Sequence, residues 1–324
     1  MSGLSPERPR GRLLFVAANP SIDRLYELDR LTTGQIHRPQ SIVAVAGGKG
    51  LNAARAAAAL GGSVTAVGIV AGRAGDWIVE QLAELGIDAR MTRARGETRT
   101  CISVLDRSTG ALTEIYERGE KIDPAAWDAL ETIVRTQLER GDVAAVALSG
   151  SLPPGAPPDG FGRIARIAAA GPRPVAVLAD TYGQALAAVL PERPAIVKLN
   201  AAEAGEASAV SVSDAASAAK AADVLRDAGA ACVVVSLGLG GAVVASGGDR
   251  TQLIPPDIRG AYPVGSGDAF LGGFAVAYAR GEPVVEAARL GLAAGIANAQ
   301  IPGAGKLDPS AIVRILERIT LISI

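Results

Sequence analysis

The sequence predicts an α/β fold in which a mainly parallel β-sheet is flanked by helices and carries a small β-sheet lid. Short apolar runs alternate with alanine-rich stretches, and each apolar run is continuous instead of alternating with polar residues. Strands covered on both faces have this pattern, and strands that alternate with helices form parallel sheets. The runs expected to be strands are residues 13–18, 63–70, 143–150, 174–180, 195–200 and 231–238. The helices expected between them are residues 50–60, 75–85, 124–139, 159–169 and 213–228.

Two segments, residues 23–46 and 88–118, interrupt this pattern. The first contains "YELDRL" and "IVAVA", and the second contains "RTCISVLD", the turn "RSTG" and "ALTEIYE". Both are typical of half-exposed antiparallel strands around turns. Because no linker or internal repeat is visible, residues 1–324 are expected to form one domain, with a lid made of about 23–46 and 88–118.

Composition excludes several classes of protein. The 324 residues are 49% hydrophobic and 20% charged, which is enough for one large core. A formal net charge of −1 gives no field that would attract nucleic acid or anionic lipid. The apolar run at 13–18 is too short for a signal peptide, and no run approaches the roughly 18 residues of a membrane span. Cys101 and Cys232 form no metal-type pair, as is usual in a reduced cytoplasmic protein.

The histidine content narrows the chemistry further. His37 is the only histidine, and it lies in the turn-like stretch "GQIHRP", which favours a place on the surface or in the lid. Nucleophile systems built on histidine and zinc sites built from His and Cys clusters are therefore not expected. The side chains that remain available for catalysis or binding are carboxylates, lysines and arginines.

Two glycine-rich stretches are candidates for holding an anion. In "GAYPVGSGDAFLGG" (260–273) glycines precede an apolar run, so backbone amides can converge on an anion at a helix N-terminus. Asp268 is then either a helix cap or a base beside a phosphate. In "AGGKGLNAARAAAALGG" (46–62) Leu51 stands where a Walker A loop needs Ser or Thr, so this stretch is not a P-loop. Its lysine, Lys49, is either solvated beside a tight turn or placed for an anionic substrate.

The same stretches resemble the two signatures of the ribokinase-like (PfkB) carbohydrate kinases. Further motifs occur in the family's order over nearly the whole chain: "NPSID" (19–23), "GETRTCI" (96–102), "SGSLPPG" (149–155), "KLNAAE" (198–203) and "VVVSLGLGGAVV" (233–244). The motifs "NPSID", "GETR" and "PVGSGD" indicate the phosphohexose branch, most similar to tagatose-6-phosphate kinases and next to 1-phosphofructokinases. The resemblance implies a ribokinase-like fold.

The resemblance also implies a reaction. ATP would phosphorylate a hydroxymethyl group of a phosphorylated ketohexose, converting tagatose 6-phosphate or fructose 1-phosphate to the 1,6-bisphosphate. Asp268 would be the general base, and Gly265, Ser266 and Gly267 would form the anion hole with it. Positioning and charge stabilisation dominate such transfers. Two alternatives remain open: a kinase of an unphosphorylated sugar or nucleoside, and a sugar-phosphate-binding regulator without catalysis.

The substrate-binding residues are carried over by matching motif positions. Sugar hydroxyls would be bound by Asn19, Asp23, Gly48 and Asn52. The substrate's own phosphate would be bound by Lys49, Arg99 and either Ser149 or Ser151. A guanidinium matches phosphate oxygens in bidentate fashion, although Arg99 is alternatively an exposed cross-strand charge.

On the nucleotide side, the family's motifs imply ATP contacts by Lys198, Asn200, Ser236, Gly238, Gly241 and Asn298. Asn200 and Glu203 resemble a magnesium site that acts through water, and their spacing also fits a helix capping box. Tyr262 stands where relatives carry the Asn or Asp that in some members helps to order a monovalent cation, so that requirement stays open. Lids of relatives often meet in a dimer, and an exposed apolar lid face predicts a homodimer here.

Overall fold

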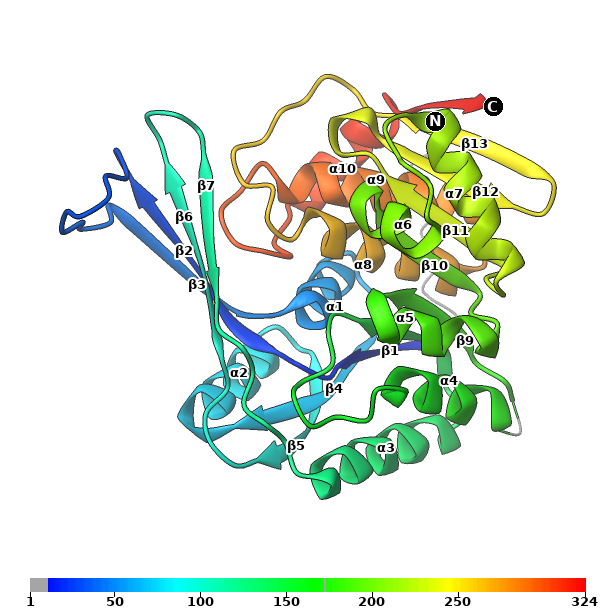
Figure 1. Cartoon of the computed structure of the whole chain (residues 1–324), viewed down its shortest axis with the longest axis horizontal. Helices are drawn as coiled ribbons and strands as arrows, with labels where there is room; N and C mark the ends of the chain where they lie inside the picture. The colour runs from blue at the N-terminus through cyan, green and yellow to red at the C-terminus, as the bar shows by residue number, and fades with distance from the viewer. Residues whose placement is uncertain (1–10, 172) are drawn as a thin grey trace.

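The described residues of the computed structural model, 11–171 and 173–324, contain a ten-stranded sheet and a separate four-stranded sheet (Figure 1). The large sheet has the strand order β14 (Thr320–Ser323), β13 (Asp249–Ile254), β12 (Ala242–Ser246), β11 (Cys232–Ser236), β10 (Ile196–Asn200), β9 (Ala176–Asp180), β8 (Val143–Ser149), β1 (Arg12–Ala17), β4 (Val64–Ala71) and β5 (Asp88–Ala94). Strands β11 to β14 pair antiparallel, and the other neighbours pair parallel. The mainly parallel sheet is confirmed.

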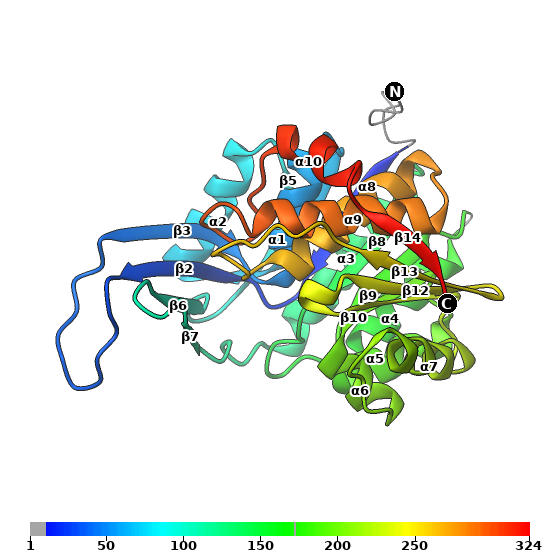
Figure 2. The ribbon, with the colours of Figure 1, turned by 90° about the horizontal axis from the view of Figure 1, so that it is seen from above.

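Helices cover both faces of the large sheet (Figure 2). One face carries α1 (Lys49–Ala59), α2 (Gly72–Glu84), α8 (Ser266–Arg280), α9 (Val284–Asn298) and α10 (Pro309–Leu316). The other carries α3 (Pro124–Glu139), α4 (Gly160–Ala170), α5 (Gly183–Val189), α6 (Ala201–Ser208) and α7 (Ala215–Asp227). Short 3₁₀ turns are η1 (Leu190–Glu192) and η2 (Gly238–Gly240). Successive side chains of β1 enter opposite cores, so Leu13 to Ala17 are all apolar. The six predicted strands and the five predicted helices are all observed.

The small sheet consists of β3 (Ser41–Gly47), β2 (Ser21–Leu28), β6 (Thr100–Asp106) and β7 (Leu112–Tyr116), in that order. It stands apart from the body in Figure 1. Two expectations are corrected. Residues 88–94 form β5, which pairs parallel with β4 at the edge of the large sheet, so this part of 88–118 lies outside the small sheet. The central pair β2 and β6 is parallel, because the two strands come from separate excursions instead of one hairpin.

Helices α1 and α8 approach closely through small residues, and this contact positions the N-terminal ends of both helices. A side chain on Gly272 would place its Cβ 2.5 Å from the carbonyl oxygen of Ala53 and 2.9 Å from the Cβ of Ala56. Among residues 11–171 and 173–324, no helix is long and apolar enough to cross a membrane.

We therefore expect Gly272→Ala to lower the free energy of unfolding by about 1–3 kcal/mol, because overpacking forces the two helices apart. Gly248→Ala is the matched control, since no atom lies within 4 Å of a Cβ added there. Thermal and denaturant unfolding of both variants measure the difference. Equal stability of the two variants would show that the α1–α8 contact has room to relax.

Candidate active site

A cleft of about 650 Å³ lies where the parallel strands β1, β8, β9, β10 and β11 end and the small sheet begins. The carboxyl edge of such a sheet is the usual place for ligands. Of the predicted site residues, the cleft is lined by Asn19, Asp23, Gly48, Lys49, Asn52, Arg99, Ser149, Ser151, Lys198, Asn200, Glu203, Ser236, Gly238, Gly265, Gly267 and Asp268. Motifs that are far apart in the sequence therefore share one cavity.

Asp268 lies in the first turn of α8, and its side chain points away from a capping position. The N-cap is Gly265, whose φ of 83° favours glycine, and Asp268 is the third helical residue. Its Oδ2 accepts a hydrogen bond of 3.0 Å from Asn52 Nδ2, so the alternative of an ordinary N-cap is wrong. Burial and the charge of Asp180 raise the pKa of Asp268 to about 6. A carboxylate with such a pKa can accept a proton near neutral pH.

Asn52 connects Asp268 to the small sheet. Its Nδ2 also lies 3.0 Å from Asp23 Oδ2, which accepts a second hydrogen bond of 3.1 Å from the amide of Gly48. The other carboxylate oxygen of Asp23 accepts from the hydroxyl of Ser21 at 2.6 Å. The start of α1 thus holds a carboxylate of β2 and a carboxylate of α8 next to each other.

Two lysines pair with Asp180, a residue that sequence reasoning did not include in the site. Lys198 Nζ lies 2.8 Å from Asp180, and Lys49 Nζ lies 3.1 Å from Asp180 and 2.8 Å from Glu203. Burial disfavours the charge of Asp180, but Lys198 and Lys49 outweigh it and hold its pKa below the ordinary value. Burial likewise disfavours the Lys49 cation, yet Asp180 and Glu203 raise its pKa. Asp180 and Lys49 are therefore both charged at neutral pH.

Asn200 and Glu203 form the capping box that was the alternative to a metal site. Asn200 Oδ1 accepts from the amide of Glu203 at 2.9 Å, and Glu203 Oε2 accepts from the amide of Asn200 at 3.0 Å. Within the described residues no group of three His, Cys, Asp or Glu side chains could hold a metal directly. Contact through water fits these residues, because Mg²⁺ keeps several of its waters.

Arg99 and two serines form the opposite end of the cleft. The guanidinium of Arg99 donates to the carbonyl oxygens of Asn19 at 3.1 Å and Glu117 at 3.3 Å. The side-chain amide of Asn19 donates to Ser151 Oγ at 3.1 Å. Arg99 Nε and Ser149 Oγ are buried and have no hydrogen-bond partner in the described part of the chain. Unpaired polar atoms that line a cleft are available to a polar ligand.

Three predicted residues do not line the cleft. Asn298 is completely buried and holds the glycine loop, since its Nδ2 donates to Val264 O at 2.9 Å and its Oδ1 accepts from Gly305 N at 2.7 Å. Gly241 packs against the carbonyl of Leu253, outside the cleft. The amide of Ser266 donates to Pro263 O at 3.1 Å, which leaves the amides of Gly267 and Asp268 in the first helical turn for an anion.

Other residues of the site were not predicted. Tyr182 lies under the ammonium group of Lys49, 5.4 Å from ring centroid to nitrogen, and Glu114 and Tyr116 of β7 line the sheet side of the cleft. Arg55 is buried beneath Asn52 and donates to Asn52 Oδ1 at 3.2 Å. Residues three apart on a helix are neighbours, so the spacing of Asn52 and Arg55 could have predicted this contact.

The comparisons with known proteins agree with this geometry. The model of the pfkB family carbohydrate kinases matches residues 16–311. A 1-phosphofructokinase from Rhodobacter capsulatus is 33% identical over 282 residues, which covers 87% of this chain and 88% of the relative. Phosphofructokinase-2 from Escherichia coli in complex with potassium has a TM-score of 0.86 at 28% identity, covering 95% of this chain and 98% of that one. The same enzyme in complex with fructose-6-phosphate has a TM-score of 0.84 at 28% identity, with the same coverage. The chain belongs to the pfkB family of carbohydrate kinases.

Proposed function

We propose that the protein is an ATP-dependent phosphofructokinase that converts fructose 1-phosphate to the 1,6-bisphosphate. The relative named 1-phosphofructokinase supports this substrate, and tagatose 6-phosphate is the second choice. The observation that carries the proposal is Asp268, a buried carboxylate with a pKa of about 6 at the N-terminus of α8. Dependence on ATP favours a cytoplasmic location, where ATP is made.

The reaction requires one proton acceptor and a place for the transferring phosphoryl group. Asp268 takes the proton of the primary hydroxyl as its oxygen attacks the γ-phosphorus, the bond from that phosphorus to the β–γ bridging oxygen breaks, and ADP leaves. The amides of Gly267 and Asp268, together with the N-terminal end of the α8 dipole, stabilise the phosphoryl oxygens. Lys198 adds a positive charge, because its ammonium group lies against Gly267.

The nucleotide lies on the side of the cleft formed by the ends of β10 and β11. Ser236, Gly238 and Lys198 line this side, and Lys49 stands between it and Asp268. Magnesium bound with ATP neutralises phosphate charge. Glu203 and Asn200 would act on it through water, as their place in a capping box allows.

The sugar phosphate lies on the side of the small sheet. Asp23, Asn19 and Asn52 offer acceptors and donors to its hydroxyls. Its phosphate is bound by Arg99, Ser149 and Ser151; in the part of the chain that the structure describes, Arg99 Nε and Ser149 Oγ lack hydrogen-bond partners. Lys49 lies closer to the nucleotide, so we assign the substrate phosphate mainly to Arg99.

The first test is a turnover assay with ATP, magnesium and a panel of sugar phosphates, free sugars and nucleosides. We expect fructose 1-phosphate to be the best substrate and Asp268→Asn to lower kcat by about 10²- to 10⁴-fold with little change in substrate affinity. The wild-type kcat/KM should fall as pH drops below about 6, because protonated Asp268 cannot act as a base. This fall should be absent from the residual rate of the variant. Binding without turnover by folded wild-type protein would establish the regulator instead.

The second test separates phosphorylated from free substrates. Charge-assisted contacts contribute about 1.5–3 kcal/mol, so Arg99→Ala should lower kcat/KM for the sugar phosphate by about 10- to 150-fold. Activity on the matching free sugar should stay within twofold, as should both activities of Arg95→Ala, an exposed arginine in the same loop. An equal loss on both substrates, or a wild-type preference for the free sugar, would favour a general sugar kinase.

We also propose that two copies associate through the outer face of the small sheet. Ile42 and Ile115 on this sheet are 57% and 60% exposed. Exposed apolar side chains on a small sheet favour pairing with a second sheet. Sedimentation at micromolar concentration should give the mass of a dimer, and a monomer would contradict the proposal.

A further inference from the structure

Tyr262 lies in the loop directly before the anion-hole residues 265–268, and its backbone is fixed to that loop's support. Its amide donates to Ala299 O at 3.1 Å, and its carbonyl accepts from Asn298 Nδ2 at 3.4 Å. The same Asn298 nitrogen donates to Val264 O at 2.9 Å. A displacement of Tyr262 is therefore transmitted to the residues that hold the phosphoryl group.

The side chain of Tyr262 reaches the small sheet. Its hydroxyl lies 3.3 Å from Glu27 Oε1, on a residue of β2 that is only 5% exposed. Arg107 lies 3.6 Å from the other oxygen of Glu27. Burial and the charge of Glu27 raise the pKa of Tyr262. The phenol therefore stays protonated and donates a hydrogen bond to the carboxylate of Glu27. The bond joins two elements that are 235 residues apart in the sequence.

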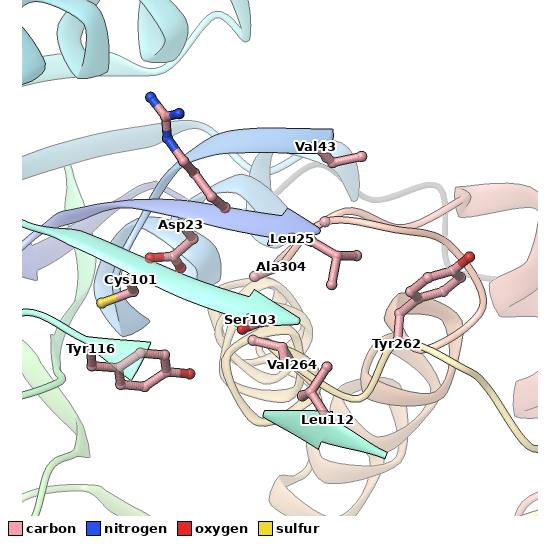
Figure 3. A pocket seen from close by; sticks show the side chains of 12 residues that line it. Asp23, Leu25, Val43, Cys101, Ser103, Leu112, Tyr116, Tyr262, Val264 and Ala304 are labelled. Atoms are coloured by element: carbon pink, nitrogen blue, oxygen red, sulfur yellow. The ribbon is translucent and has the colours of Figure 1, made fainter. Parts of the chain in front are cut away.

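The face of β2 that carries Glu27 also borders the part of the cleft where the sugar is proposed to bind. Asp23, Leu25 and Glu27 alternate along the strand and so point to the same side. Figure 3 shows Leu25 and Leu112 of the small sheet facing Val264 and Ala304, with Tyr262 at one end. The space left between them is about 30 Å³, room for about one water molecule. The small sheet is thus seated on the loop by an apolar contact, with Asp23 at one end and Glu27 at the other.

We propose that the hydrogen bond between Tyr262 and Glu27 is a latch, and that Tyr262 is a positioning residue for phosphoryl transfer. The small sheet carries Asp23 and contacts the sugar phosphate, whereas the loop carries the anion hole. In-line attack therefore requires that the sheet and the loop keep a fixed position relative to each other. Glu27 lies four residues beyond Asp23, or about 13 Å along an extended strand. Without the latch the sheet is held mainly at its Asp23 end. This inference rests on the proposed function for its kinetic effect.

The kinetic test uses Tyr262→Phe, which keeps the ring and removes the hydroxyl. We expect kcat/KM for the sugar phosphate to fall about 5- to 30-fold, as loss of one or two kcal/mol implies, while the Kd of ATP stays unchanged. ATP hydrolysis without sugar product should rise relative to transfer, because the looser sheet admits water. Tyr278→Phe is the matched control: Tyr278 lies on α8 beside Phe274, and its hydroxyl has no hydrogen-bond partner in ranges 11–171 and 173–324. It should behave like the wild type.

A second readout does not need catalysis. Cys101 and Cys232 are the two cysteines of the chain, and Cys101 lies on the inner face of β6 between the sheet and the loop, whereas Cys232 lies in the main core. In native protein without ligands, Tyr262→Phe should increase the rate at which iodoacetamide alkylates Cys101 at least fivefold. Alkylation of Cys232, which reports on general unfolding, should not change. If the wild type has no kinase activity, the proposed function fails, and this measurement alone decides whether the latch exists.

Variants of the acceptor complete the test. Glu27→Gln keeps an oxygen for the phenol and should stay within about twofold of the wild type in both measurements. Glu27→Ala, which also removes the contact with Arg107, should lose at least as much as Tyr262→Phe, and the double variant should be no worse than Glu27→Ala, because the hydrogen bond is already absent. Unchanged kcat/KM or unchanged Cys101 alkylation in Tyr262→Phe overturns the proposal. Equal acceleration at both cysteines, or additive losses in the double variant, assigns the residues a general stabilising role and overturns it as well.

Discussion

The amide group of Asn52 is the contact on which the geometry of the cleft depends. Its nitrogen lies 3.0 Å from a carboxylate of the small sheet, Asp23, and 3.0 Å from a carboxylate of α8, Asp268. Its oxygen accepts from Arg55, which fixes the orientation of the amide because the arginine can only donate. Helix α1 thereby places the two carboxylates close together through a shared neutral amide, with the Arg55 guanidinium behind it. The proposed base and the strand that carries Asp23 are therefore positioned by the same amide.

The charges around this contact explain why the base differs from its neighbours. Asp180 and Asp268 are both buried, but Asp180 lies against two lysines and stays ionised, whereas Asp268 accepts its hydrogen bond from a neutral amide. Two buried carboxylates in different surroundings have pKa values on opposite sides of the ordinary value. The separation fits the proposed roles, proton transfer for Asp268 and charge balance for Asp180. Lys49 and Lys198, which keep Asp180 charged, also line the cleft.

Local patterns predicted much of this molecule, and contacts between distant segments account for what they missed. The continuous apolar runs predicted the strands of the large sheet. The resemblance of "GGKGLN" and "GSGD" to the family's signatures predicted that Lys49, Asn52 and Asp268 share one site, and all three line one cleft. The pattern of residues 88–94 was ambiguous, because an edge strand of a large sheet is half-exposed like a strand of a lid. Asn298 is buried beneath the glycine loop and Gly241 packs against Leu253, so neither reaches the cleft. A sequence motif does not describe such packing. The partner of Tyr262 lies 235 residues away, and no local signal links the two.

The unpaired atoms at the sugar end of the cleft bear on selectivity. Ser149 Oγ and Arg99 Nε are buried without partners among the described residues, which costs free energy, and a ligand that supplies acceptors to both would recover it. Under the proposed assignment of the substrate phosphate, a sugar without the phosphate leaves both groups unpaired, so it lacks the new contacts while the protein keeps the cost. Sites built in this way discriminate more strongly than apolar pockets, in which a missing group leaves only a small gap. The proposed selectivity for a phosphorylated sugar thus has a physical basis in the folded chain, which carries the cost of these two buried atoms.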